Sequence, residues 1–189
     1  MRIISGEFGG RILKSPSKSL PVRPTTDRVK ESLFSMLTNL VDFDGMTVCD
    51  LFAGTGSLGF EALSRGAAHV TFVERSAQVG RLLRGNTSLL RVENRCKIWN
   101  LPTESFLMKC DQSFDLIFAD PPYAYEGYPR LLELIAEKQM FNVRGLLIVE
   151  HGKAPLPQAP ESLKVHETRQ YGDTSVTIYK RIPEEGEPI

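Results

Sequence analysis

Short apolar runs alternate with amphipathic stretches through the middle of this 189-residue chain. Short apolar runs are typical of strands buried in a parallel sheet, whereas apolar positions three and four residues apart are typical of helices. The pattern predicts strands at 47–52, 69–73, 96–100, 114–119 and 145–150, and helices near 57–65, 76–90 and 128–138. Because strands alternate with helices, we expect an α/β fold with a Rossmann-like, mostly parallel, doubly wound sheet.

The two ends of the chain have different patterns. Residues 2–13 contain two short stretches around glycines and predict a small β-hairpin. Apolar residues at helical spacing follow Thr26 and Asp27, both acceptable caps, so a helix is expected to begin there. Near the C-terminus, 163–168 and 175–181 flank a Tyr-Gly-Asp turn and predict an antiparallel hairpin at the sheet edge. We expect a single domain over 1–189, with an N-terminal extension over 1–40 and a Rossmann-like core over 45–182.

A glycine-rich turn follows the first strand of this core. Gly54, Gly56 and Gly59 form a G-x-G-x-x-G pattern between a strand and a helix, and Glu74 ends the next strand. Such a turn lets a ligand approach the backbone closely, and an acidic residue about 20 positions later can bind ribose hydroxyls. The same pattern serves nicotinamide dinucleotides, so a nicotinamide-dependent oxidoreductase is one candidate. Asp50, just before the turn, favours a ligand with an ammonium group over a pyrophosphate.

A second motif, Asp120-Pro121-Pro122-Tyr123, follows the apolar run at 114–119. Ligands in open α/β sheets bind outside the carboxyl ends of strands. Two prolines make this segment rigid, while the Asp120 carboxylate and a proline carbonyl can accept hydrogen bonds from an amine. Tyr123 offers a flat face on which a base can stack. Hydride transfer has no evident use for this arrangement, so the motif favours S-adenosylmethionine as the cofactor.

Composition restricts the class of protein but does not identify a ligand. Hydrophobic residues make up 41% and charged residues 24%, as in ordinary globular proteins, and no apolar run approaches a membrane span. Three scattered cysteines without a C-x-x-C pair indicate a reduced, cytoplasmic location and no metal site. The net charge is zero, yet residues 1–30 carry seven Lys or Arg against two acids, as phosphate contacts would require. Nothing demands more than a monomer.

Five stretches identify a resemblance that covers nearly the whole chain. Residues 50–59 are similar to motif I of class I S-adenosylmethionine-dependent methyltransferases, and 120–123 to the motif IV of their amine-methylating members. More narrowly, residues 2–6, Gly10-Arg11 and the block 23–34 resemble the bacterial 16S ribosomal RNA guanine-N2 methyltransferases. The resemblance implies methylation of the exocyclic N2 of a guanine in small-subunit RNA, free or within the subunit. An N6-adenine methyltransferase on DNA or RNA is the same-fold alternative.

The resemblance also assigns roles to residues. Asp120, Pro121 and Tyr123 would grip the amine and stack the base, giving the catalytic set. The cofactor set would be Asp50, Phe52, Gly54, Gly56, Glu74 and Arg75. The RNA set would be Arg11, Arg23, Thr25 and Arg28, with Lys30 as a further phosphate contact. An ion pair with Glu31 is the alternative for Arg28. Pro102 stands where the family often has Asn or Asp near the adenine amino group, so Asn100, Thr103 or a backbone group could make that contact.

Overall fold

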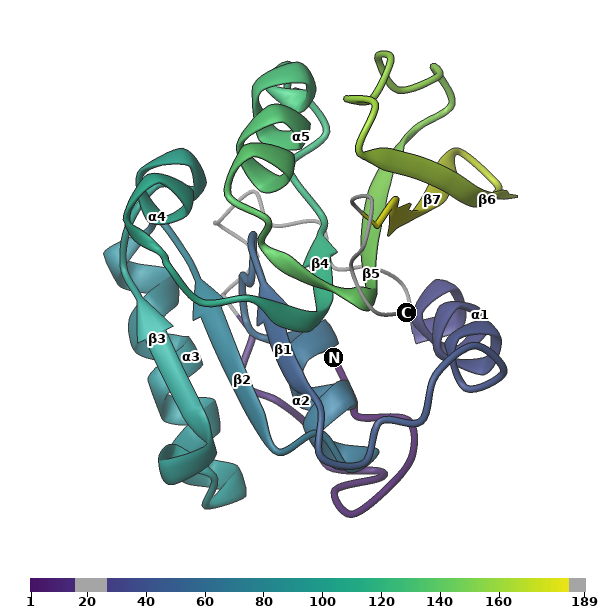
Figure 1. Cartoon of the computed structure of the whole chain (residues 1–189). Helices are drawn as coiled ribbons and strands as arrows, with labels where there is room; N and C mark the ends of the chain where they lie inside the picture. Colours follow the sequence, from purple (N-terminus) through teal and green to yellow (C-terminus); the bar gives the residue numbers. More distant parts are fainter. Residues whose placement is uncertain (16–26, 184–189) are drawn as a thin grey trace.

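A twisted sheet of seven strands in the order β3-β2-β1-β4-β5-β7-β6 organises the computed structural model, which describes residues 1–15 and 27–183 (Figure 1). The strands are β1 (Thr47–Asp50), β2 (His69–Val73), β3 (Cys96–Trp99), β4 (Phe114–Ala119), β5 (Phe141–Gly152), β6 (Leu163–Tyr171) and β7 (Thr174–Arg181). Strands β1 to β5 run parallel, while β7 is antiparallel to both β5 and β6. The predicted Rossmann-like sheet with a C-terminal antiparallel hairpin is confirmed.

Helices cover both faces of the sheet. They are α1 (Asp27–Leu37), α2 (Ser57–Ser64), α3 (Ala77–Leu90), α4 (Thr103–Lys109) and α5 (Tyr128–Glu137), with a 3-10 turn at Glu93–Arg95. Successive side chains of β4 alternate between the faces: Leu116 and Phe118 pack with α1, α2 and α3, whereas Ile117 packs with α4 and α5. Two apolar layers therefore hold the central strands rigidly, as a ligand site at their ends requires.

The largest differences from the sequence prediction are at helix α4 and strand β5. Helix α4 was not predicted, because a seven-residue helix with few buried side chains leaves little periodicity to detect. Strand β5 extends beyond the predicted 145–150 at both ends, and its pairing with β4 shifts register between Phe114 and Leu116. Of the added residues, only His151 and Gly152 pair with β7, whereas Phe141 pairs with Phe114 of β4. None of the helices in the described part of the chain has the length and apolarity needed to cross a membrane.

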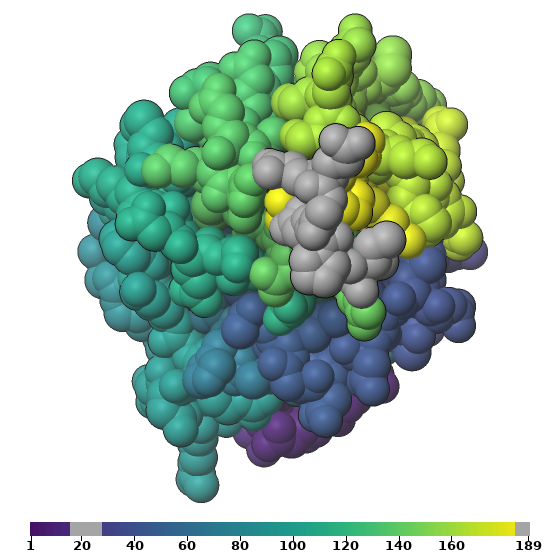
Figure 2. Space-filling view, in the orientation of Figure 1, coloured from purple at the N-terminus to yellow at the C-terminus, as the bar shows by residue number. Residues whose placement is uncertain are grey.

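The N-terminal ribbon, defined here as residues 1–14, is the predicted hairpin. Arg2 and Ile12 form an antiparallel bridge, and the Ile3 N–H donates to the Arg11 carbonyl at 3.0 Å. Phe8 is buried and anchors the ribbon on α2, where its N–H donates to the Ser64 hydroxyl at 2.9 Å. In the space-filling view the atoms of the N-terminal ribbon, coloured purple, lie at the lower edge of the molecule, away from the yellow C-terminal strands (Figure 2).

Candidate functional site

Three carboxylates gather at the carboxyl ends of neighbouring strands. Asp50 ends β1, and in the parallel register it lies opposite Phe72 of β2 and Phe118 of β4. Glu74 and Asp120 each follow two residues beyond those partners. Because the carboxyl ends of parallel strands meet at one edge, the three acids converge although they are far apart in sequence. This edge is the candidate site.

The glycine turn between β1 and α2 has the backbone geometry that the sequence predicts. Gly54 and Gly56 adopt positive φ angles of 53° and 86°. A Cβ on Gly56 would lie 2.4 Å from the ring of Phe60 and 2.6 Å from the side chain of Leu83. Only glycine fits there, since the conformation and the packing both exclude a side chain. The turn therefore places the half-buried backbone of Gly54 beside the three acids, while Gly56 is buried against the core.

Glu74 is held beside this turn by two backbone donors. Its Oε2 accepts from the Gly54 N–H at 3.0 Å, and its Oε1 accepts from the Ser76 N–H at 2.7 Å. A carboxylate has about four acceptor positions, so each oxygen can accept a further hydrogen bond. A pair of ribose hydroxyls fits this fixed, half-buried carboxylate. Arg75, the next residue, is exposed to solvent.

Asp50 is buried, with 2% of its surface exposed. Its Oδ2 accepts from the Gly59 N–H at 3.1 Å. Burial raises the pKa of Asp50 to about 7; the Gly59 hydrogen bond opposes this rise, and the charges of Asp120 and Glu74 add to it. An edge with three acids favours a cationic ligand group and repels a pyrophosphate. These carboxylate acceptors thus fit S-adenosylmethionine, which carries an ammonium, a sulfonium and ribose hydroxyls, better than a dinucleotide.

The segment after β4 forms an exposed lip. Pro121 is buried, whereas Tyr123 is 80% exposed and its ring lies beside Gly152 at the end of β5. The Pro122 carbonyl accepts from the Tyr125 N–H at 2.8 Å, which closes the turn. The structure thus brings Asp120 and Tyr123 together at the edge that holds Asp50 and Glu74.

An aromatic wall that the sequence analysis missed stands beside this lip. Tyr125 packs edge-on against both Phe52 and Tyr128, with ring centroids 5.2 Å apart in each pair. The Tyr125 hydroxyl donates to Glu104 Oε1 at 2.8 Å. Burial, together with the charges of Asp120 and Glu150, raises the pKa of Tyr128 to about 12. The repeated tyrosines after the Asp-Pro-Pro-Tyr motif were the available signal, but their partner Glu104 lies on the unpredicted α4.

The candidate adenine contacts that follow β3, Asn100 and Thr103, form hydrogen bonds within the protein. Asn100 Nδ2 donates to the Glu74 carbonyl at 2.7 Å, and its Oδ1 accepts from Arg84 at 3.0 Å. The Thr103 hydroxyl is buried and donates to the Leu51 carbonyl at 2.7 Å. Both side chains fix the walls of the site. Pro102 is exposed and caps α4.

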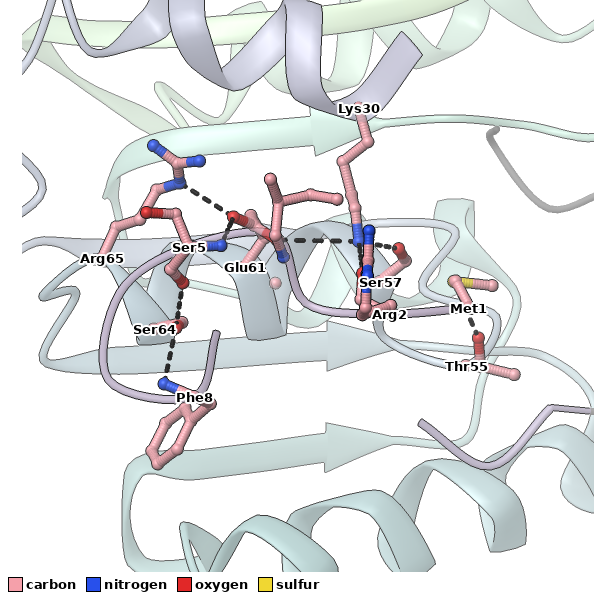
Figure 3. Close-up of polar contacts among 12 residues, drawn as sticks. Met1, Arg2, Ser5, Phe8, Lys30, Thr55, Ser57, Glu61, Ser64 and Arg65 are labelled. Atoms are coloured by element: carbon pink, nitrogen blue, oxygen red, sulfur yellow. Dashed lines mark hydrogen bonds and ion pairs between the residues drawn. The ribbon is translucent and has the colours of Figure 1, made fainter. Parts of the chain in front are cut away.

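Lys30 is not a phosphate contact, so that prediction is wrong. Its side chain is fully buried, and Nζ donates to the Arg2 carbonyl and to Ser57 Oγ at 3.1 Å (Figure 3). It also pairs with Glu61 Oε2 at 3.6 Å. The same Glu61 carboxylate accepts from the Ile4 N–H at 2.7 Å. This buried pair joins α1 and the N-terminal ribbon to the first turn of α2, directly behind the glycine turn.

The remaining RNA candidates are only partly placed by the structure. Arg11 and Arg28 are exposed, on the ribbon and on α1 respectively. Arg23 and Thr25 lie outside the described residues. The structure therefore brings the catalytic and cofactor candidates to one edge, while Arg11 lies on the ribbon behind α2.

Comparison with known proteins agrees with this geometry. The family described as Conserved hypothetical protein 95 matches residues 1–180. A Bacillus subtilis (strain 168) protein named "Putative rRNA methyltransferase YlbH" is 40% identical over 185 residues, which cover 96% of this chain and 99% of the relative. "Ribosomal RNA small subunit methyltransferase D" of Escherichia coli (strain K12) is 34% identical over 182 residues, or 96% of this chain and 90% of the relative. The chain belongs to the family described as Conserved hypothetical protein 95, whose relatives include these ribosomal RNA methyltransferases.

A solved structure extends the likeness to three dimensions. "Putative methyltransferase yhhF from Escherichia coli" superimposes with a TM-score of 0.85 at 32% identity, over 96% of this chain and 97% of that one. The resemblance on which the sequence analysis relied is thereby confirmed, and with it the class I methyltransferase fold.

Proposed function

We propose that this chain transfers a methyl group from S-adenosylmethionine to the exocyclic N2 amine of a guanine in 16S ribosomal RNA. One observation carries the proposal: Asp50 and Glu74 meet Asp120 at a single sheet edge, so a cofactor half and an amine-binding half adjoin. The family supports the RNA substrate, since its relatives are named ribosomal RNA methyltransferases. The choice of N2 rests on the resemblance of residues 23–34.

The cofactor half is built from the ends of β1 and β2. Glu74 would accept hydrogen bonds from the ribose hydroxyls with the acceptor positions that Gly54 and Ser76 leave open. Asp50, ionised, would attract the ammonium of the methionine portion. Gly54 and Gly56 let that portion lie against bare backbone. Phe52 and Arg75 flank the turn and would border the bound molecule.

The amine half is the lip after β4. When bound, S-adenosylmethionine supplies a methyl group on a positively charged sulfonium. Asp120 and the Pro121 carbonyl would accept hydrogen bonds from the two amine hydrogens and hold the nitrogen in line with that methyl. Alignment of this kind contributes roughly 7–11 kcal/mol. The Asp120 carboxylate also stabilises positive charge that develops on the nitrogen, and it is placed to receive the proton that the product amine releases.

The base itself would stack on Tyr123. An 80% exposed ring at the lip is available to a base that has left its helix. The wall of Phe52, Tyr125 and Tyr128 excludes water from one side of the lip. Without water, the hydrogen bonds of Asp120 to the amine become stronger. Arg11, Arg23, Thr25 and Arg28 remain the proposed RNA contacts on the N-terminal side.

A methyl-transfer assay tests this function. Small ribosomal subunits from cells that lack the enzyme would be incubated with S-adenosylmethionine labelled in its methyl group. We expect label in the 16S RNA with the parent enzyme and almost none with Asp120→Asn, although that variant still binds S-adenosylhomocysteine. Labelling of the RNA at the parental rate by Asp120→Asn would contradict the role of the carboxylate.

A further inference from the structure

Helix α3 presents a basic stripe to solvent. Residues 75–92 contain four arginines and no acidic residue. Arg81, Arg84, Ser88 and Arg91 recur at helical spacing and all four are exposed, whereas most of the residues between them are buried or half-buried. At 1.5 Å per residue the stripe is about 15 Å long. It begins near Glu74, at the carboxyl ends of the parallel strands, where the candidate site lies. It ends near the amino ends of those strands.

The stripe ends at a hollow between α3 and the N-terminal ribbon. The hollow has a volume of about 470 Å³, and its polar lining consists mainly of Arg11, Arg91 and Arg95, with Glu7 as the acid. Arg95 pairs with Glu7 at 3.3 Å and donates to the Ala67 carbonyl at 2.7 Å, so its guanidinium forms the floor. Within the described part of the chain, no ion pair engages Arg11 or Arg91. Two guanidinium groups thus remain available to an anion.

The backbone at Arg91 allows its side chain to be removed without loss of helix geometry. Arg91 ends α3 in the left-handed conformation, with φ 60° and ψ 44°. Its N–H donates to the Ser88 carbonyl, and the Val92 N–H donates to the Thr87 carbonyl at 3.0 Å. This is the Schellman arrangement, in which glycine is the usual residue at the left-handed position. Gln139 follows α5 in the same arrangement, so the conformation does not itself mark a binding site; it provides a position where glycine can replace the side chain without backbone strain.

We propose that the hollow binds a backbone phosphate of the RNA substrate between the guanidinium groups of Arg11 and Arg91. The inference rests on the proposed function, and it adds Arg91 and the α3 stripe to the RNA-binding surface. A phosphate fits because a guanidinium group can donate two parallel hydrogen bonds to two of its oxygens. The hollow lies about one helix length from the methyl-transfer edge, so it would anchor RNA that flanks the target and leave the modified base free to enter the site.

The test distinguishes the loss of the Arg91 guanidinium group from a loss of protein stability. Arg91→Gly removes the guanidinium and installs the residue that the left-handed position prefers, so its melting temperature should equal or exceed that of the parent. Gln139→Gly is the matched control for the backbone, because Gln139 also has a positive φ, 47°, and follows α5 on the other face of the sheet. Arg130→Ala is the matched control for charge, because it removes an exposed arginine from α5.

Binding of the three variants to small ribosomal subunits that lack the modification would be measured over a series of salt concentrations. We expect Arg91→Gly to raise Kd roughly tenfold, the loss of one charged hydrogen-bond contact. Its plot of log K against log salt should be shallower by roughly one unit. Both control variants should bind like the parent. In a double-mutant cycle of Arg91→Gly with Arg11→Ala, each substitution should raise Kd by less when the other is already present, because the two side chains share one phosphate.

Three results would overturn the inference: parental binding by Arg91→Gly, an equal loss in Arg130→Ala, or weaker binding that only follows a lower melting temperature. If the parent binds and methylates the subunits while Arg91→Gly matches it, the phosphate site fails and the proposed function stands. If the parent itself neither binds nor methylates them, the proposed function fails, and this inference fails with it.

Discussion

Replacing Asp50 with asparagine should stabilise the free protein and lower its affinity for the cofactor. The folded pKa of Asp50 is about 7, against 3.8 for an unburied aspartate. Because the folded value is the higher one, the folded state holds a proton that the unfolded chain has lost between these two pH values. The unfolding free energy therefore falls as pH rises through this window, and the loss is complete above about pH 7.

The size of the effect follows from the shift. About three pKa units at 1.36 kcal/mol each give a penalty of roughly 4 kcal/mol when Asp50 is charged. The asparagine side chain would keep an oxygen for the Gly59 N–H, which donates at 3.1 Å in the parent, but it would bury an amide group at a cost of about 1–3 kcal/mol. We expect Asp50→Asn to be more stable than the parent by about 2 kcal/mol at pH 8. At pH 4 Asp50 is protonated in the folded state, so only the cost of the amide remains and Asp50→Asn should be less stable than the parent by about 1–3 kcal/mol.

Urea unfolding at the two pH values measures this difference, and Asp115→Asn is the matched control. Burial raises the pKa of Asp115, but hydrogen bonds from Thr47 and Asn142 outweigh it and lower the pKa below its usual value. The control should therefore lose stability at pH 8. Affinity for S-adenosylhomocysteine, whose ammonium Asp50 would attract, should rise with pH up to about 7 in the parent. Equal stability of Asp50→Asn and the parent at both pH values would refute the reasoning.

Substitutions at four other positions probe the rest of the site and the buried pair behind it. Asp120→Asn should lower kcat by about 10²–10³ with little change in cofactor affinity, which single-turnover transfer and calorimetry separate. Glu74→Gln should weaken S-adenosylhomocysteine binding about tenfold in the same calorimetry, since a charged acceptor for hydroxyls is lost. Tyr123→Ala should raise KM for RNA without lowering the melting temperature, because the ring is 80% exposed; Tyr123→Phe should restore KM. Lys30→Met should lower the free energy of unfolding by about 1–3 kcal/mol, because it removes one of the two cations of the buried Glu61 and leaves the pair with Arg65 at 3.0 Å; near-parental stability would show that Lys30 is not needed.

The sequence was sufficient for the parts of the site that local chain geometry determines. A glycine turn between a strand and a helix shows itself in consecutive residues, and so does an acid at a strand end. Gly54, Gly56, Glu74 and Asp120 could therefore be placed before the structure was known. Parallel pairing then brings the strand ends together without further information. Even the N-terminal hairpin followed from glycine positions and short apolar stretches.

Long-range packing decided what the sequence could not predict. Lys30 stands in a basic block and looks like a surface cation, but the carboxylate that neutralises it comes from Glu61 on another helix. The wall around Tyr125 depends on α4 meeting the segment before α5, and α4 is too short to leave a clear pattern. The left-handed backbone of Arg91 had no signal in the chain, since glycine is the residue expected there.

The central claim concerns which atom receives the methyl group. Small subunits lacking the modification would be treated with the enzyme and isotope-labelled S-adenosylmethionine, and the 16S RNA would be digested to nucleosides for mass analysis. The account predicts one labelled nucleoside, N2-methylguanosine, and its absence with Asp120→Asn. Label in N6-methyladenosine, or in no nucleoside while cofactor binding is intact, would contradict it.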